Sequence, residues 1–543
     1  MKKILFIFIS LLGVALFSGC SDMLEEENIR KPIADGYYTT PEGFEDLVES
    51  AYPYIRRWYA REEAFTFTTF GTDIWIAGAD GSWKPYNLYD AGIQPSNSIL
   101  WDIWNEFYLG IAACNAAIDR APGVTGMDET LKAQRVGEAK FMRAMFYHIM
   151  VMQWGGVPLR IKEVTEVETE AVRASEEEVY NQIIKDLKEA EAVLPATTSQ
   201  YGRATKPAAQ ALLARVYLTI GKNAEAAEYA KHVINDYSFK LVPDVKDLWD
   251  QTKQKNTEVI WAVQHTVDER LNNSYGNRAH LYFIMEYDIE KGMTRDVING
   301  RPWKRFMPSR YFIDMLQASR ENDSRFDKLW KQVWYANVES NTAFPNMKKG
   351  DTAVYVVPYS ASEAEKTARK AKYNFYDVSF YYGNDNIPDG KRSRFPSLNK
   401  FLDPLRPTMQ HEPGSRDWFV FRLAEMQLIA AEALMKQNKQ EEGVAYFNSV
   451  RTRAAWPGKE EAMKITAAEL TLDKILEERA MELCGEMFRW PDLKRTGTLI
   501  DRVKRYNVDG APNIKSIHLY RPIPQNEIDR VTNKEEFKQN EGY

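Results

Sequence analysis

The sequence predicts a mainly α-helical fold in which tetratricopeptide-like helix pairs form one globular scaffold, with long loop-rich insertions containing short strands. Three observations predict it. Apolar residues recur at spacings of three and four through several long segments, which is the period of an amphipathic helix. A helix-turn-helix pattern occurs twice, near Tyr217 and near Leu434. Two stretches between the helical parts are rich in glycine, asparagine and aromatic residues.

The amino terminus has the pattern of a lipoprotein leader. Two lysines precede an apolar run over residues 4–17, which Ser18, Gly19 and Cys20 close. The run is shorter than the roughly 20 apolar residues of a membrane-spanning helix, and small residues at its end mark a cleavage site. We expect residues 1–19 to be a signal peptide, Cys20 to carry the lipid, and residues 20–36 to form a tether.

Residues 37–235 carry the signals of several long helices and form the predicted N-terminal helical part. One helix is expected over residues 99–118, and a second over residues 131–154, where Gly155 and Gly156 end it. Ser175 and Glu178 have the spacing of a capping box at the start of a third helix.

The repeated helix pair has the spacing of the tetratricopeptide motif. The first copy places Tyr217, Gly221 and Ala226 in register, and the second places Leu434 and Gly443 at the matching positions. Small residues at Ala226 and Gly443 allow paired helices to approach closely. Because the two copies are far apart in sequence, we expect them to pack within one globule rather than in a solenoid.

Two regions depart from the helical pattern. The glycine-rich, aromatic loop 66–97 interrupts the N-terminal part, and the middle region, residues 236–415, alternates strand-like runs with loops. Residues 416–543 form the predicted C-terminal helical part. Long irregular insertions on a compact scaffold are common places for binding sites.

The composition argues against several classes of protein. The formal net charge is −6, and removal of Lys2 and Lys3 with the leader makes it −8, which disfavours binding to nucleic acid. Apart from Cys20, the chain has only Cys114 and Cys484, both in apolar helical contexts typical of buried thiols. The six histidines show no zinc-binding spacing, and no nucleophile-elbow or phosphate-loop motif occurs. We expect no catalytic residues, no metal and no cofactor, although the sequence leaves a structural calcium ion open.

Several stretches, in order along nearly the whole chain, resemble the SusD/RagB family of Bacteroidetes outer-membrane lipoproteins. The tail is the most specific of them. The stretches are residues 138–147 (EAKFMRAMFY), 154–159 (WGGVPL), 202–206 (GRATK), 421–426 (FRLAEM), 478–495, 520–524 (YRPIP) and 539–543 (QNEGY).

This resemblance implies a location and a role. Family members are anchored in the outer membrane by lipid, face the cell exterior, and cap a SusC-like TonB-dependent transporter. They capture nutrients, usually oligosaccharides, for import. The resemblance therefore implies an oligosaccharide ligand and a SusC-like partner for this chain.

A sugar-binding site needs flat rings for the C–H faces of the sugar and polar groups for its hydroxyls. Loop 66–97 and the middle region offer this mixture, and the family resemblance points to the same stretches. Trp83 is the first candidate, followed by Trp303 and Trp75. The predicted ligand-binding residues are Trp83, Trp75, Asp73, Asp80, Tyr86, Tyr89, Trp303, Tyr282 and Tyr287.

Other functions remain open at this point. A branch of the family binds peptides, so a peptide-binding nutrient-capture lipoprotein is the nearest alternative. A surface glycoside hydrolase is another, because the chain has many carboxylates and sequence alone cannot show whether two of them converge. A third is a structural gate for the transporter that binds no ligand itself.

Overall fold

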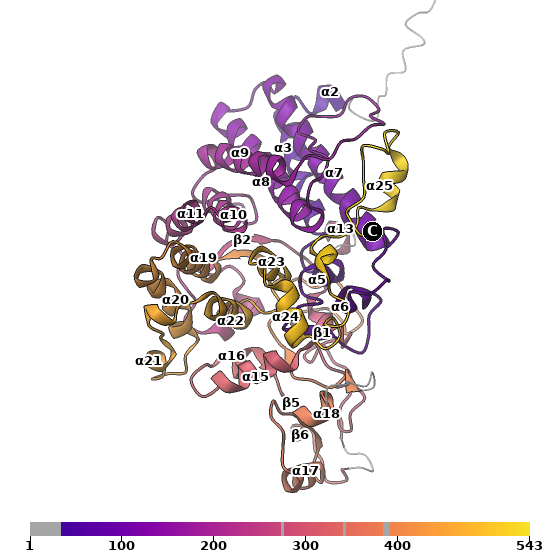
Figure 1. The fold of residues 1–543 in the computed structure, drawn as a ribbon, viewed down its shortest axis with the longest axis vertical. Helices are drawn as coiled ribbons and strands as arrows, with labels where there is room; N and C mark the ends of the chain where they lie inside the picture. Colours follow the sequence, from indigo (N-terminus) through magenta and orange to yellow (C-terminus); the bar gives the residue numbers. More distant parts are fainter. Residues whose placement is uncertain (1–33, 273–275, 340–343, 384–390) are drawn as a thin grey trace, which may run out of the picture.

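The computed structural model describes residues 34–272, 276–339, 344–383 and 391–543. The predicted signal peptide, Cys20 and most of the tether lie outside these residues. The structure is about 48% helix and 8% strand, which confirms the predicted mainly helical scaffold. Figure 1 shows the N-terminal helices at one end, the C-terminal helices beside them, and part of the middle region projecting at the opposite end.

The N-terminal part is built on long helices, and the three helices expected from caps and spacing are confirmed as α7, α8 and α9. Helix α9 begins with the predicted capping box between Ser175 and Glu178. The helices are α2 (Ala34–Tyr37), α3 (Pro41–Glu49), α4 (Tyr52–Ile55), α5 (Glu62–Thr68), α6 (Pro85–Leu88), α7 (Ser98–Arg120), α8 (Glu129–Trp154), α9 (Glu176–Val193), α10 (Lys206–Thr219) and α11 (Asn223–Asn235).

The two copies of the predicted repeat lie side by side. Helices α10 and α11 form the first pair, and α19 (Leu423–Lys436) and α20 (Gln440–Ala454) form the second. Helix α11 packs against α19, which joins the two pairs in one globule, as predicted (Figure 1). A Cβ atom on Gly443 would lie 3.1 Å from the Ala431 carbonyl oxygen, so a small residue is needed where α20 crosses α19.

The middle region contains short strands, as expected, but also more helix than its sequence pattern indicates. Most of its strands pair with distant segments, all antiparallel: β3 pairs with β1 (Trp75–Ala77) of loop 66–97, β2 pairs with β9 (Trp418–Arg422), and β4 pairs with β8. Strands β5, β6 and β7 form a small sheet. The elements are α12 (Val245–Leu248), β2 (Val259–Val263), α13 (Glu269–Asn272), α14 (Ala279–Tyr282), β3 (Phe306–Pro308), α15 (Arg310–Ser319), α16 (Arg325–Leu329), β4 (Trp330–Lys331), β5 (Val333–Tyr335), β6 (Thr352–Val356), α17 (Glu363–Lys370), β7 (Asn374–Tyr376), α18 (Val378–Tyr381) and β8 (Ser397–Leu398).

The C-terminal part returns across the whole molecule. Strand β9 (Trp418–Arg422) leads into the second repeat pair, and the last helix, α25 (Gln525–Arg530), packs back on α7 (Figure 1). Between them lie α21 (Glu460–Met463), α22 (Leu472–Glu482), α23 (Arg489–Arg495) and α24 (Leu499–Tyr506).

One large apolar core connects these parts. Cys114 and Cys484 are both buried free thiols, as expected from their apolar contexts.

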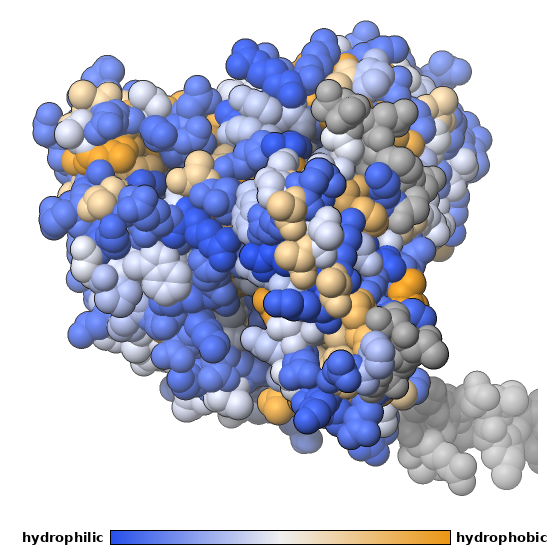
Figure 2. Space-filling model, turned by 90° about the horizontal axis from the view of Figure 1, so that it is seen from below, coloured by the Kyte–Doolittle hydropathy of each residue, from blue (hydrophilic) through white to orange (hydrophobic). Residues whose placement is uncertain are grey.

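No helix in the described part of the chain is long and apolar enough to cross a membrane. Figure 2 views the molecule from the end at which β5 and α17 project, and the described surface there is mainly hydrophilic, with apolar residues in small groups.

Candidate functional site

The pairing of β1 with β3 brings the two predicted binding regions together. Ile76 is opposite Met307 in this antiparallel pair, so the loop after β1 and the loop before β3 emerge at the same end. The backbone N–H of Gly78 donates to the Arg305 carbonyl oxygen at 2.9 Å, and that of Asp80 donates to the Lys304 carbonyl oxygen at 3.3 Å. We call residues 78–84 and 300–305 the paired loops.

Trp303 lies half-buried on the second of these loops. Its backbone N–H donates to the Leu281 carbonyl oxygen at 2.9 Å, which fixes the loop to α14. The guanidinium carbons of Arg305 and Arg301 lie 4.8 and 5.6 Å from the centre of its ring. The indole is therefore held among cations while part of its surface remains open to solvent.

Trp83 lies half-buried on the first loop, directly before α6. The ammonium group of Lys84 donates to the Ala79 carbonyl oxygen at 3.1 Å and closes the loop. A Cβ atom on Gly81 would lie 3.1 Å from Cδ of Arg305, the arginine that also flanks Trp303. The two loops are thus in contact through Arg305.

Asp80 contributes a half-exposed carboxylate to the same surface. The Lys304 ammonium lies 3.1 Å from Asp80 and 2.7 Å from Glu286. Burial alone would lower the pKa of Lys304, but Glu286 and Asp80 outweigh it and raise that pKa. Lys304 also has a positive φ of 48°, which an L-residue adopts rarely and which is common at functional loops. The paired loops therefore combine two part-exposed indoles with fixed charged groups.

Two other candidates in loop 66–97, Asp73 and Trp75, have structural roles in the core. Asp73 is fully buried and accepts hydrogen bonds from Arg489 and Arg502 at 2.6 and 2.7 Å, which ties β1 to α23 and α24. Trp75 is 1% exposed and stacks on Trp330 with ring centres 5.8 Å apart. Because neither side chain reaches the surface, predicting them as ligand contacts was wrong.

Tyr86 and Tyr89 are also buried, so they too have no face for a ligand. The Tyr86 hydroxyl donates to Asn97 at 3.2 Å, and the Tyr89 hydroxyl donates to the Gly71 carbonyl oxygen at 2.7 Å. These bonds close loop 66–97 on itself. The rings of Tyr86 and Trp83 also meet in a T-shaped contact with their centres 6.5 Å apart, so Tyr86 supports the predicted binding ring.

Tyr282 and Tyr287 are also buried, and they support the second loop from the interior of the protein. The ring of Tyr282 lies 5.9 Å from that of Trp303. The Tyr287 hydroxyl donates to the Gly300 carbonyl oxygen at 2.6 Å, at the base of the loop. Both tyrosines hold Trp303 in place without being available for contact with a ligand.

Sequence reasoning missed the charged residues around Trp303. Arg301, Lys304 and Arg305 flank Trp303 directly in the sequence, and this clustering of basic residues around one tryptophan was a usable signal. Glu62 and Glu286 hold Arg305 and Lys304 but are distant in sequence, so only the fold reveals them.

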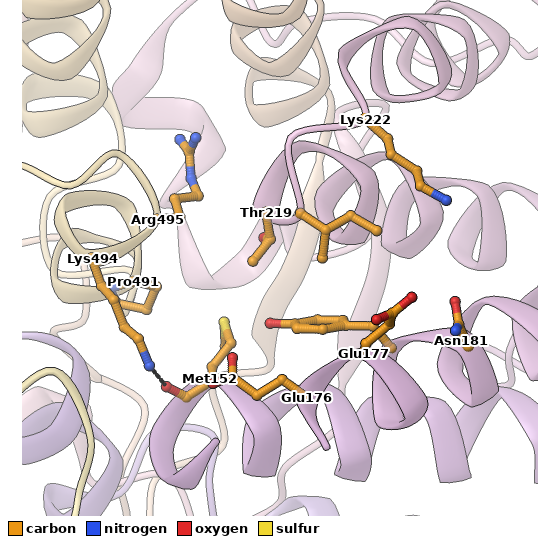
Figure 3. Close-up of a pocket in the computed structure, with 11 residues that line it drawn as sticks. Met152, Glu176, Glu177, Asn181, Thr219, Lys222, Pro491, Lys494 and Arg495 are labelled. Carbon is orange, nitrogen blue, oxygen red and sulfur yellow. Dashed lines mark hydrogen bonds between the residues drawn. The ribbon is translucent and has the colours of Figure 1, made fainter. Parts of the chain in front are cut away.

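A cavity of about 470 Å³ lies elsewhere, between α8, α9 and α23, and contains none of the predicted residues (Figure 3). In Figure 3 the Lys494 ammonium points to the Met152 carbonyl oxygen, to which it donates at 2.6 Å. Burial lowers the pKa of Lys494 to about 7. Because Met152 is in the last turn of α8, the Lys494 side chain pairs one of the carbonyl oxygens left free at the end of that helix.

The described residues include no group of three or more His, Cys, Asp or Glu side chains arranged to hold a metal ion. The expectation that the protein needs no cofactor remains a prediction.

Comparison with known families decides the classification. A family model described as the SusD family matches residues 257–543, more than half of the chain. The chain belongs to the SusD family. A second family model, described as starch-binding and associating with the outer membrane, matches residues 39–218.

Relatives within the SusD family match most or all of the chain. The SusD-like protein P2 of Formosa agariphila is 27% identical to this chain, and the alignment covers all of both chains. The starch-binding protein SusD of Bacteroides thetaiotaomicron is 26% identical, over 81% of this chain and 78% of its own length.

Solved structures of SusD-like proteins share the fold. A laminarin binding SusD-like protein aligns with a TM-score of 0.70 and 23% identity, covering 93% of this chain and all of its own. The surface glycan-binding protein A from Bacteroides thetaiotaomicron, in complex with laminarihexaose, aligns with a TM-score of 0.65 and 20% identity, over 92% and 99% of the two chains.

Proposed function

We propose that this protein captures oligosaccharides at the cell surface and delivers them to a SusC-like TonB-dependent transporter in the outer membrane. Membership of the SusD family supports the role, as do relatives whose names describe binding of starch, laminarin and laminarihexaose. Those ligands belong to the relatives, and the glycan that this chain binds is to be found by experiment.

The observation that carries the proposal is the contact between the paired loops, each with a half-buried tryptophan. A sugar ring would stack on Trp83 or Trp303, while its hydroxyls would bond to Asp80, Lys304 and Arg301. These charged groups already contact one another or neighbouring carboxylates, so they are held in place before the ligand arrives. Such preorganisation reduces the entropy lost on binding.

The direct test is calorimetry of the purified mature protein against a panel of plant, algal and microbial oligosaccharides. We expect binding to at least one glycan and no release of reducing sugar on long incubation with it. Binding to peptides alone would contradict the proposal, as would hydrolysis of the bound glycan.

The transporter partnership rests on family membership, so it needs its own experiment. Purification of the native lipoprotein in mild detergent should recover a TonB-dependent barrel in stoichiometric amount. Repeated purification of the lipoprotein alone would count against the partnership.

The lipid anchor on Cys20 is the third part of the proposal, and it rests on the leader sequence. Cys20→Ala should leave the protein unprocessed or release it from the membrane fraction, because the acyl chains supply the membrane affinity. Intact-mass measurement of the wild-type protein should show a lipid adduct on the chain that begins at Cys20. A mature chain without the adduct would contradict the anchor.

A further inference from the structure

Exposed apolar side chains gather on one side of the N-terminal part. Of the twelve large apolar side chains that are exposed in the described residues, five lie on α7 or on residues 158–172, which we call the α8–α9 loop. They are Leu109, Ile161, Val164, Val167 and Val172. Single exposed apolar residues are ordinary on a protein surface, but a group of them marks a surface for an interaction.

The α8–α9 loop borders a groove. A hollow of about 350 Å³ follows the loop itself, and a smaller one of about 170 Å³ lies between the loop, α7 and α25. The two hollows share Arg160 and Val164, so they form one continuous groove. Trp101 lines it from α7, half-buried, with the guanidinium carbon of Arg530 4.2 Å from its ring centre. The groove therefore offers apolar surface to the side chains of a partner.

The middle of the α8–α9 loop is held by its backbone only at the two ends. The N–H of Glu163 donates to Asp119 at 2.8 Å, and the Thr169 carbonyl oxygen accepts from the N–H of Thr532 at 2.8 Å. Between these points, the backbone groups of residues 164–168 make no hydrogen bond to any residue that the structure describes. Such groups are open to pairing with an extended segment of another chain.

The first described residues lie next to this groove. The guanidinium carbon of Arg120 lies 5.8 Å from the ring centre of Tyr38, and Arg120 forms an ion pair with Glu163 at 2.7 Å. Figure 1 accordingly shows α2 at the same end of the molecule as α7. Cys20, the predicted anchor, precedes Ala34 by 14 residues, which span at most about 50 Å. An anchor at Cys20 would keep the groove close to the outer membrane.

The charge of the loop favours a protein over lipid as the partner. Its two cations already pair with carboxylates, Arg160 with Glu168 and Lys162 with Asp119. Glu166 has no ion pair among the described residues, and the loop has four glutamates in all. A surface with this negative charge is repelled by anionic lipid headgroups, but it complements a basic protein segment.

We propose that the groove along the α8–α9 loop is the surface on which the transporter docks. It would receive an extended, basic segment from the extracellular side of the barrel. Val164 and Val167 would be buried in the contact, and residues 164–168 would supply backbone hydrogen bonds. This proposal rests on the transporter partnership proposed above, and it assigns that partnership to a part of the chain distant from the paired loops.

The test is recovery of the barrel with charged variants of the loop. Native lipoprotein carrying Val164→Asp or Val167→Asp is purified in mild detergent, and the amount of TonB-dependent barrel per lipoprotein is compared with the wild type. We expect at least a tenfold loss, because each change places a charge where an apolar side chain would be buried. Val167 is 92% exposed, so the thermal melt of Val167→Asp should not change.

The matched control is Val508→Asp. Val508 is 47% exposed, as Val164 is at 46%, but it lies beyond α24 and outside the groove. This variant should recover the barrel as the wild type does. All three variants should also bind glycan normally, because none of the changed residues belongs to the paired loops.

Two further measurements separate a protein partner from other occupants of the groove. Glu166→Lys should recover at least threefold less barrel, since it reverses a charge that faces a basic segment. Mature protein prepared without its acyl chains should not bind phosphatidylglycerol vesicles, and it should sediment as a monomer.

Four results would overturn the proposal. If the wild type recovers no barrel, the partnership itself fails and the docking surface with it. If the wild type recovers the barrel and both valine variants recover as much, only the docking surface is wrong. Vesicle binding that Val167→Asp abolishes would assign the groove to lipid. A dimer that Val167→Asp dissociates would assign it to a second copy of this chain.

Discussion

Exposure separates the two tryptophans of loop 66–97, although both follow an aspartate in a glycine-rich stretch. Trp75 lies on β1 and stacks on Trp330 inside the core, whereas Trp83 lies on the loop beyond the strand and is only half-buried. A partly exposed indole is unfavourable unless a partner covers it, so Trp83 is the better ligand contact. Trp303 meets the same condition on the second loop.

Asp73 gives a direct test of the distinction between support and contact. Asp73→Asn leaves Arg489 and Arg502 buried without their carboxylate, so we expect a loss of about 3–5 kcal/mol in the free energy of unfolding, measured by urea denaturation.

The matched control is Asp80→Asn, since Asp80 is half-exposed and its ion pair with Lys304 is worth about 1 kcal/mol or less. If Asp73→Asn lost glycan affinity while keeping its stability, Asp73 would be a ligand contact after all.

At the scale of elements, the pairing of β1 with β3 creates the site. A Cβ atom on Gly78 would lie 2.0 Å from the Lys304 carbonyl oxygen, closer than any real contact of that kind. Gly78→Ala should therefore push the paired loops apart and weaken glycan binding at least tenfold, measured by calorimetry. Gly123→Ala is the control, because its new Cβ atom would meet only Thr39 at 3.5 Å. Equal affinity for the wild type and Gly78→Ala would show that the loops need not touch.

The ion pair between Glu432 of α19 and Arg495 of α23 should make the stability of the fold depend on pH. Burial of Glu432 alone would raise its pKa, but Arg495 outweighs this and lowers the pKa to about 2, against an ordinary value of 4.5. This carboxylate therefore stabilises the fold above about pH 4.5, and its contribution is lost as the pH falls towards 2.

Thermal melts between pH 4.5 and 2 test this contribution. The melting temperature of the wild type should fall more steeply than that of Glu432→Gln, which lacks the titrating group. Parallel profiles for the two proteins would show that Glu432 does not contribute.

For the whole molecule, local signals predicted the helical scaffold well. The capping box acts between Ser175 and Glu178, which are three residues apart, and the small residues Ala226 and Gly443 each lie at a contact between paired helices. Both kinds of signal are visible in the sequence. These signals gave α9 and both repeat pairs correctly.

Long-range contacts were beyond such reasoning. The partners of Asp73, which are Arg489 and Arg502, come from the other end of the chain, and β1 pairs with a strand more than two hundred residues later. Burial of Trp75, Tyr282 and Tyr287 follows from these contacts and not from their own surroundings in the sequence. Sequence therefore found the two loops of the candidate site but could not tell which of their aromatic residues face solvent.

The measurement that tests the proposed site most directly is calorimetry of Trp83→Ala and Trp303→Ala with the best glycan of the panel. Each change removes a ring that would stack on the sugar, at a cost of about 2 kcal/mol. We expect each variant to bind at least tenfold more weakly, with little change in its thermal melt.

The matched control is Trp456→Ala, because Trp456 is also half-buried beneath a cation, Lys328 at 5.6 Å, but lies outside the paired loops. That variant should bind as the wild type does. If Trp83→Ala and Trp303→Ala bound the glycan normally, or lost affinity only because they unfolded, the paired loops would not be the binding site.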